Sequence, residues 1–298
     1  MKHHYVPQFL LRAWTEGASD GRLVEFRTDL KGMPSKRKAP AATAFGDGLY
    51  AATGTLAPTI DRDAVETQLL QRVDDDAAKV RNRLLTAKVK SLTSAERSAW
   101  TRFLMAMRTR QPKMISRFRE VGTEEIRRTL AQGPEEYAAL RNDEDPGNFE
   151  DWVNANFPGM IENFGLKVFG SLVDSELIGN KMIRLNWMRW TFGDVRHELL
   201  LSDNPVVFVG GIDAPDLMVA VPLSPSAAFF AVRNGDLTER LRRADPDELV
   251  RRLNESVVGQ ATARVYARSE RPRRFVEKLV SKAVTASFTD SAHGQNRS

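Results

Sequence analysis

The chain changes character within the stretch Met182-Ile-Arg-Leu-Asn-Trp-Met-Arg-Trp-Thr-Phe192. Apolar side chains alternate along it at Ile183, Leu185 and Trp187, which is the period of a β-strand. The residues before this stretch repeat with a helical period, and short β-rich runs broken by Gly, Pro and Asp follow it. Helices and strands are therefore grouped along the chain, and the sequence predicts an α+β fold.

The part before this switch, from about residue 60 to 178, predicts a series of helices. The first begins near Asp61, with Asp61 or Asp63 as its cap, and has apolar residues three and four apart at Val65, Leu69, Val73, Ala77, Val80 and Leu84. Thr93-Ser-Ala-Glu96 fits a capping box for a second helix, and Pro112 should end or kink that helix. We expect further helices over 113–132 and 149–178, the latter interrupted near Pro158 and preceded by a loop over 142–147.

Strands are expected mainly in the second half of the chain, from about residue 180 to 268. The β-rich runs are Leu23–Arg27, Met182–Phe192, Glu198–Ser202, Val206–Val209, Leu217–Pro222, Ala227–Arg233 and Ala263–Arg268. We interpret 28–48 as a loop, and we expect helices from Asp245 to about Gly259 and over 272–283. The predicted architecture is a single composite domain over residues 1–289. Its helical middle packs on a mainly antiparallel sheet, formed by the C-terminal half and the N-terminal segment, and 290–298 form a disordered tail.

Composition excludes several classes of protein. The 298 residues include no cysteine, so disulfides, thiolate metal sites and cysteine nucleophiles are excluded. No apolar run is long enough for a membrane span, and the chain start lacks a secretory signal, so we expect a bacterial cytoplasmic protein without membrane contact. Lys and Arg exceed Asp and Glu by 44 to 39, a modest surplus that is compatible with a nucleic-acid partner. The oligomeric state stays open.

The first residues carry the best candidate for chemistry. Two of the four histidines are adjacent, at His3 and His4, and Pro7 and an apolar run follow them. In an extended segment these neighbours point to opposite faces, which disfavours a shared metal ion. One imidazole would then face a pocket while the other supports it through a hydrogen bond, and the alternative is a pair of packed or exposed histidines.

Other candidates lie far along the chain. Asp203, in Ser202-Asp-Asn-Pro205, could ligate a cation or orient a histidine, but the same sequence is typical of a strand-to-strand turn whose Asp bonds nearby backbone amides. Arg110 could hold an anion or lie at the surface, and Asn254 indicates a buried hydrogen-bonding role or an exposed position. Phosphate-loop, dinucleotide and His-Glu-x-x-His motifs are absent from the sequence.

The opening His3-His-Tyr-Val-Pro-Gln-Phe-Leu-Leu-Arg12 resembles the start of a bacterial family known as domain of unknown function 4238. Later landmarks agree in order over roughly residues 2–268, among them Gly48-Leu-Tyr50, Arg110 before Pro112, Ser202-Asp-Asn-Pro205 and Pro222-Leu-Ser-Pro225. Where such sequences tend to carry a second Glu on the first long helix, this chain has Asp74-Asp-Asp76. The resemblance implies that distant polar residues converge, and it implies no established activity.

The His-His-x-x-Pro pattern also looks like the first element of HNH-type nucleases, whose first histidine is a general base. Those enzymes complete a metal site with a later Asn and His, and no histidine follows here before His197. We nevertheless expect a hydrolase of phosphodiesters, namely a metal-dependent nuclease. The alternatives are a non-catalytic binding module in a phage-defence or stress system and a regulatory domain that senses a nucleotide.

The expected site brings the histidines against Asp203 and Asn204. Its catalytic residues would be His3, His4, Asp203 and Arg110, with a histidine as general base. Substrate would be bound by Tyr5, Gln8, Asn204 and Asn254. A divalent cation, Mg²⁺ or Mn²⁺, would be held by Asp203, Glu66 and Asp75.

Overall fold

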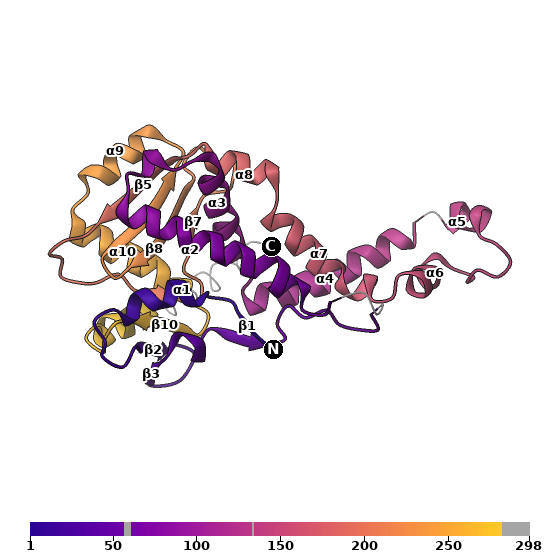
Figure 1. Ribbon diagram of the computed structural model, residues 1–298, viewed down its shortest axis with the longest axis horizontal. Coiled ribbons are helices and arrows are strands. Elements are labelled where there is room, and N and C mark those ends of the chain that lie inside the picture. Colours follow the sequence, from indigo (N-terminus) through magenta and orange to yellow (C-terminus); the bar gives the residue numbers. More distant parts are fainter. Residues whose placement is uncertain (57–60, 133, 282–298) are drawn as a thin grey trace, which may run out of the picture.

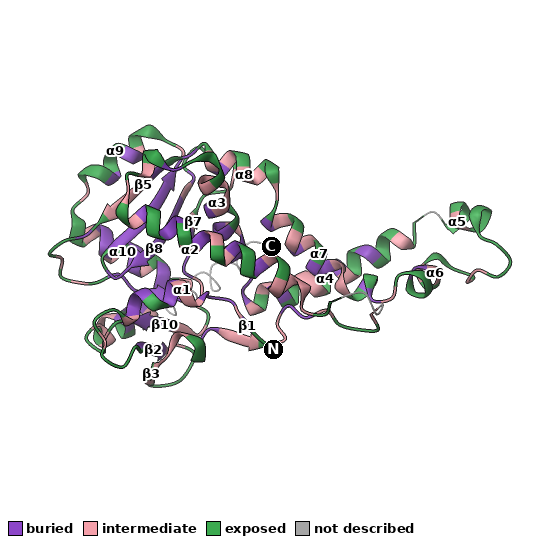
Figure 2. Cartoon of the chain, in the orientation of Figure 1, coloured by how far each residue is buried: buried purple, intermediate pink, exposed green. Residues whose placement is uncertain are grey.

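The computed structural model describes residues 1–56, 61–132 and 134–281. Figure 1 shows a broad body of strands and helices, from which a long helical arm extends to one side. Buried residues concentrate in the body, while the far end of the arm is largely exposed (Figure 2). The predicted α+β class is confirmed, because antiparallel sheets built from N-terminal and C-terminal strands pack with helices from the middle of the chain.

One four-stranded sheet joins the two ends of the chain. Its order is β3 (Ser35–Lys38), β2 (Leu23–Arg27), β10 (Arg264–Ala267) and β6 (Leu201–Ser202), and every neighbouring pair is antiparallel. The pairing of β2 with β10 links residues about 240 positions apart and places the N-terminal segment beside the C-terminal half.

A second four-stranded sheet lies at the centre of the body. Its order is β5 (Asn186–Thr191), β9 (Ala227–Val232), β8 (Met218–Ser224) and β7 (Val207–Val209). Alternate residues of β9 enter two different cores: Phe229 packs with α3 (Ser94–Thr109), and Phe230 packs with the helices α9 (Gly235–Arg243) and α10 (Pro246–Gly259). Helices therefore cover both faces of this sheet, which explains why β8 and β9 are apolar almost throughout.

The helices α2 (Gln71–Thr86) and α3 form the layer on the first face. The predicted capping box is present at the start of α3, where Thr93 and Glu96 each bond the other's backbone amide. Helix α3 ends at Thr109, and Pro112 occupies the first turn of α4 (Pro112–Leu130), so the predicted interruption is confirmed. A π-helix, η3 (Val65–Leu70), leads directly into α2, and the Gln71 amide bonds the Glu66 carbonyl five residues back.

The arm consists of α4 and α7 (Met160–Val173), with α5 (Pro134–Leu140) and α6 (Phe149–Asn156) at its far end. Gly122 and Gly165 let α4 and α7 touch backbone to backbone, since a Cβ on Gly165 would lie 2.0 Å from the Phe118 carbonyl oxygen. Helix α8 (Glu176–Ile183) returns the chain to the body.

The N-terminal segment forms β1 (Lys2–His4), which pairs with β4 (Phe45–Asp47), and then α1 (Gln8–Leu11). The interpretation of 28–48 as a loop was wrong for β3, for β4 and for the single 3-10 turn Pro40–Ala42. The Ser-Lys-Arg-Lys sequence of β3 has no apolar residue, because an edge strand needs only backbone pairing and often carries charge.

The strand expected over Met182–Phe192 begins only at Asn186, because Met182 and Ile183 form the end of α8. Of the strand expected over Glu198–Ser202, only Leu201–Ser202 is formed. The other predicted elements agree with the structure to within a few residues, including the helix that Asp245 caps. Helices α5 and α9 were not predicted. The tail expected over 290–298 lies outside the described residues. None of the described helices has both the length and the apolar character that a bilayer crossing needs.

Candidate functional site

Strand β1 places its two histidines in different environments. His3 is fully buried and its ring stacks on Tyr50, whereas His4 is half-buried and contacts Phe45. Opposite faces are what an extended segment dictates for adjacent residues. The two imidazoles therefore meet different partners.

Both ring nitrogens of His3 have neighbours that hold the ring. Nδ1 accepts the backbone N–H of Tyr50 at 2.9 Å, and Nε2 lies 3.0 Å from Oδ1 of Asp63. Because Nδ1 is an acceptor, the neutral ring carries its proton on Nε2, facing Asp63. Burial lowers the pKa of His3, and the Asp63 carboxylate opposes that shift. His3 is thus suited to fixing Tyr50 and Asp63 beside β1 rather than to meeting a reactant.

His4 has a ring nitrogen that is free to act. Its Nε2 is buried and has no hydrogen-bond partner among the described residues. Burial lowers the pKa of this imidazole, a backbone hydrogen bond at Ala41 opposes the shift, and the positive charge of Arg110 adds to it. The ring is therefore neutral near pH 7 and can accept a proton.

Glu66 lies against the same strand from the π-helix η3. The His4 amide approaches its carboxylate, and Oε2 is buried without a hydrogen-bond partner in the described part of the chain. Burial raises the pKa of Glu66 to about 7, although Arg110 counteracts it. A carboxyl with this pKa can donate or accept a proton at neutral pH.

Arg110 is fully buried behind these two groups. Its Nη1 donates to both carboxylate oxygens of Asp74, at 2.9 and 3.1 Å, and its carbonyl accepts the Tyr50 hydroxyl at 2.8 Å. Asp74 thus neutralises the guanidinium, and Asp75, the acid expected here, is exposed instead. A side chain paired in this way acts on His4 and Glu66 through its electrostatic potential rather than by touching a substrate.

Sequence reasoning missed the roles of Asp63, Asp74 and Gln111. Both polar side-chain atoms of Gln111 are buried without a hydrogen-bond partner in the described chain. Its only sequence signal is its place between Arg110 and Pro112. Asp74 belongs to a run of three aspartates, and only the direction of each side chain on α2 distinguishes it from Asp75.

Asp203 belongs to a second polar cluster. Its carboxylate accepts the backbone N–H groups of Thr262, Ala263 and Arg264 at 2.8, 2.8 and 3.0 Å. Asp203 thus bonds backbone amides, but these amides lie about 60 positions away in the sequence and not in the same turn, as the turn interpretation had it. Among the described residues, no hydrogen bond or ion pair joins His3 or His4 to Asp203, against which they were expected to lie. The N-terminal segment reaches this cluster through Tyr5, whose hydroxyl accepts from Nη1 of Arg264 at 2.6 Å.

The residues expected to bind substrate do not converge. Asn254 is buried, accepts the Leu200 amide at 2.8 Å and donates to the Glu198 carbonyl at 3.0 Å, so its predicted buried hydrogen-bonding role is confirmed. The Asn204 side chain donates to the backbone carbonyl of Gln260, and the Gln260 side chain donates to the backbone carbonyl of Asn204. Gln8 is half-buried at the first position of α1.

The metal site expected from Asp203, Glu66 and Asp75 does not form as a cluster. These acids lie in three environments: one bonded to backbone amides, one half-buried beside His4 and one exposed. Within residues 1–56, 61–132 and 134–281, no group of three or more His, Asp and Glu side chains is arranged to hold a metal ion.

Comparison with known proteins supports the resemblance noted in the sequence. No curated protein and no solved structure matches this chain. The model of one family, described as "Protein of unknown function (DUF4238)", matches residues 2–271 and so covers most of the chain, including both polar clusters. The chain therefore belongs to the DUF4238 family.

Proposed function

We propose that this chain hydrolyses phosphodiester bonds in a nucleic acid, with His4 and Glu66 as the acid–base pair. The observation that carries the proposal is that Nε2 of His4 and Oε2 of Glu66 are both buried and unpartnered in the described chain. Burial lowers the pKa of His4 and raises that of Glu66 to about 7, so near pH 7 the imidazole can accept a proton while protonated Glu66 is present to donate one.

The proposed reaction uses groups of the protein alone. Nε2 of His4 removes a proton from the attacking water, and the water oxygen bonds to phosphorus. The bond from phosphorus to the leaving oxygen then breaks, and protonated Glu66 supplies the proton for that oxygen. The buried positive charge of Arg110 stabilises the negative charge that develops on the phosphate oxygens during the reaction. The carboxylate of Asp74 weakens this effect.

The test is incubation of the purified protein with labelled RNA, single-stranded DNA and duplex DNA, with and without Mg²⁺ or Mn²⁺. His4→Ala and Glu66→Gln should each lower the cleavage rate at least about 100-fold while the protein stays folded. His197→Gln is the matched control, because His197 stacks on Phe275, which packs against the core around β2 and β10. Absence of cleavage under every condition would contradict the proposal, and a strict need for Mg²⁺ or Mn²⁺ would restore the metal-dependent mechanism expected from the sequence.

A second candidate, a non-catalytic binding or regulatory module, has an observation of its own. His3, Arg110 and Asp203 are nearly or fully buried, and each is held by named partners, as in a closed polar network that fixes a segment. This candidate predicts that His4→Ala leaves cleavage at background and that nucleotides or RNA raise the melting temperature. Thermal melting with and without these ligands distinguishes the two functions.

A further inference from the structure

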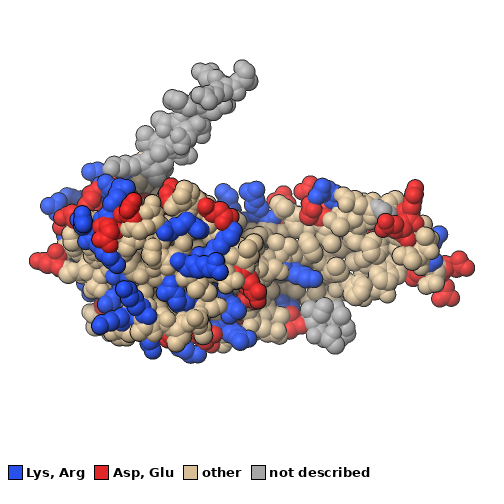
Figure 3. All heavy atoms as spheres, turned by 90° about the horizontal axis from the view of Figure 1, so that it is seen from above, with Lys and Arg blue, Asp and Glu red and all other residues tan. Residues whose placement is uncertain are grey.

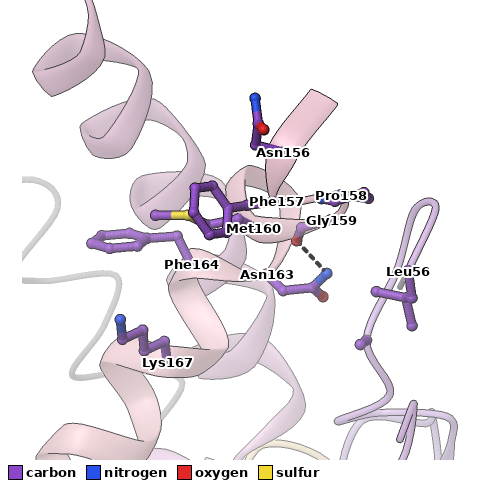
Figure 4. A pocket seen from close by; sticks show the side chains of 10 residues that line it. Leu56, Asn156, Phe157, Pro158, Gly159, Met160, Asn163, Phe164 and Lys167 are labelled. Atoms are coloured by element: carbon purple, nitrogen blue, oxygen red, sulfur yellow. Dashed lines mark hydrogen bonds between the residues drawn. The ribbon is translucent and has the colours of Figure 1, made fainter. Parts of the chain in front are cut away.

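The arm contains a cavity of about 350 Å³ between the α6–α7 turn and the segment over 52–56 (Figure 4). Its lining is almost wholly apolar and includes Leu56, Phe157, Pro158, Met160 and Phe164. Phe157 and Met160 are 52% and 37% exposed, so water contacts apolar surface that a ligand would cover. A concave apolar lining of this size is typical of a small-molecule site.

The walls of this cavity are held in place without a ligand. The Asn163 side chain accepts the Thr53 N–H at 2.9 Å and donates to the Thr53 and Gly159 carbonyls at 2.8 and 2.7 Å. Gly159 has a φ of 80°, and a Cβ there would lie 2.7 Å from the Leu56 side chain. The two walls are therefore pinned together, and a ligand would enter a preformed space.

The polar groups of the lining restrict what the ligand can be. Asn163 is occupied by the bonds above, and the Asn156 amide donates to the Trp152 carbonyl. Polar atoms buried in the cavity would lack partners, so the body of the ligand must be apolar. Lys167 is the one charged side chain of this lining; it lies beside Phe164 in Figure 4 and forms no ion pair with the described residues.

Lys167 also lines a neighbouring cavity of about 420 Å³, which contains Arg72 and Arg102. Arg102 pairs with Asp174 at 2.9 Å, and Asp76, the other acid there, pairs with Lys79 at 3.1 Å. This pairing leaves Arg72 and Lys167 as cations without a carboxylate partner in the described part of the chain. Figure 3 shows basic and acidic side chains interspersed over the body, while the far end of the arm carries mainly acidic ones.

We propose that these adjoining cavities bind a single-chain amphiphile with one acidic group. Its apolar chain would occupy the cavity walled by Phe157, Met160 and Phe164, and its carboxylate or phosphate would lie between Lys167 and Arg72. The proposal stands on residues other than His4 and Glu66, so it does not depend on the hydrolytic function.

Calorimetric titration of the full chain with decanoate, decyl phosphate and 1-decanol tests this site. Both anions should bind at least about tenfold more tightly than the alcohol. Lys167→Ala should weaken decanoate binding about tenfold and leave 1-decanol unchanged, whereas Met160→Trp, which fills the cavity, should weaken all three ligands. Lys113→Ala removes an exposed lysine from α4 as the matched control and should change nothing.

Three results would overturn the proposal: no binding of either anion up to about 1 mM, equal affinity for decanoate and 1-decanol, or decanoate binding that survives both Lys167→Ala and Met160→Trp. Circular dichroism checks that each variant is folded, and Phe157→Ala, at a more exposed wall position, replaces Met160→Trp if that variant does not fold. The stronger of the two anions identifies the head group as carboxylate or phosphate.

Discussion

Glu66 couples stability to pH, because burial raises its pKa from 4.5 to about 7 in the folded chain. Its contribution to stability is complete below pH 4.5 and is lost as the pH rises through 7. The neutral Gln side chain does not titrate, so Glu66→Gln keeps its stability while the parent loses some. We expect the unfolding free energy of the variant, relative to that of the parent, to rise by about 1–2 kcal/mol from the lower to the higher pH, after allowance for solvent screening. Urea unfolding of both proteins at about pH 5 and about pH 7.5 measures the change.

Glu120→Gln is the control for that experiment, since Glu120 is an exposed carboxylate on α4. Its difference from the parent should be the same at both values of pH. If Glu66→Gln behaves in the same way, Glu66 titrates as an ordinary surface acid and cannot serve as the proposed proton donor.

Asp203 should prove structural. Asp203→Ala removes the acceptor of three backbone N–H groups, so we expect about 3 kcal/mol of destabilisation by urea unfolding. Asp203→Asn, which keeps one acceptor oxygen, should lose roughly half as much. If Asp203→Ala instead abolished cleavage without changing stability, Asp203 would have a catalytic role.

The same residue shows how far sequence reasoning reaches. The Ser-Asp-Asn-Pro pattern indicates a turn with a backbone-bonding carboxylate, and that is local chemistry. The amides that Asp203 bonds belong to residues 262–264, and only the pairing of β6 with β10 brings them there. His3 and Asp63 are a similar case: the histidine stood out in the sequence, but its partner depends on the path of the chain between them.

Among the elements, the crossing of α4 and α7 depends on two glycines. Gly165→Ala would place a methyl group 2.0 Å from the Phe118 carbonyl oxygen, so we expect about 3 kcal/mol of destabilisation. Gly179→Ala, in α8, meets no atom within 4 Å and should stabilise the protein by about 0.5–1 kcal/mol. Thermal unfolding of the two variants compares them directly, and similar melting temperatures would show that the helices can separate at no cost.

Element prediction succeeded where a local rule decides. The capping box at Thr93, the proline start of α4 and the cap at Asp245 each depend on a few adjacent residues. It failed at β3, whose charged sequence carries no β signal and which is held by its pairing with β2. The pairing of α4 with α7 in the arm could not be predicted either, because the sequence does not show that Gly122 and Gly165 face each other across two helices.

For the whole molecule, the body should fold independently of the far end of the arm. Helix α5 contributes no buried residue, and the contacts of Tyr137 among the described residues stay within the tip: its hydroxyl bonds the Pro146 carbonyl and its ring stacks on Phe149 of α6. Replacing residues 134–147 with an equally long Gly–Ser segment should shift the melting temperature by less than about 2 °C. A fall much larger than this would mean that the tip stabilises the body.

For the whole molecule, the sequence predicted the fold class but not the division of the strands into separate sheets. Grouped helices and strands suffice for an α+β assignment. The separation into two four-stranded sheets depends on long-range pairings such as β2 with β10, and a single sequence does not encode partner choice in a readable form.

The π-helical geometry of η3 determines the direction in which the Glu66 side chain points. Each hydrogen bond of a π-helix spans five residues instead of the four of an α-helix, so removing one residue within Val65–Leu70 would let the segment continue α2 in ordinary geometry. Each residue of such a helix turns the next by about 100°, so the carboxyl would swing away from β1 by roughly that angle. An insertion in a loop elsewhere could be harmless, but here a change of one residue would separate Glu66 from His4, its partner in the proposed acid–base pair, while the helix itself survives.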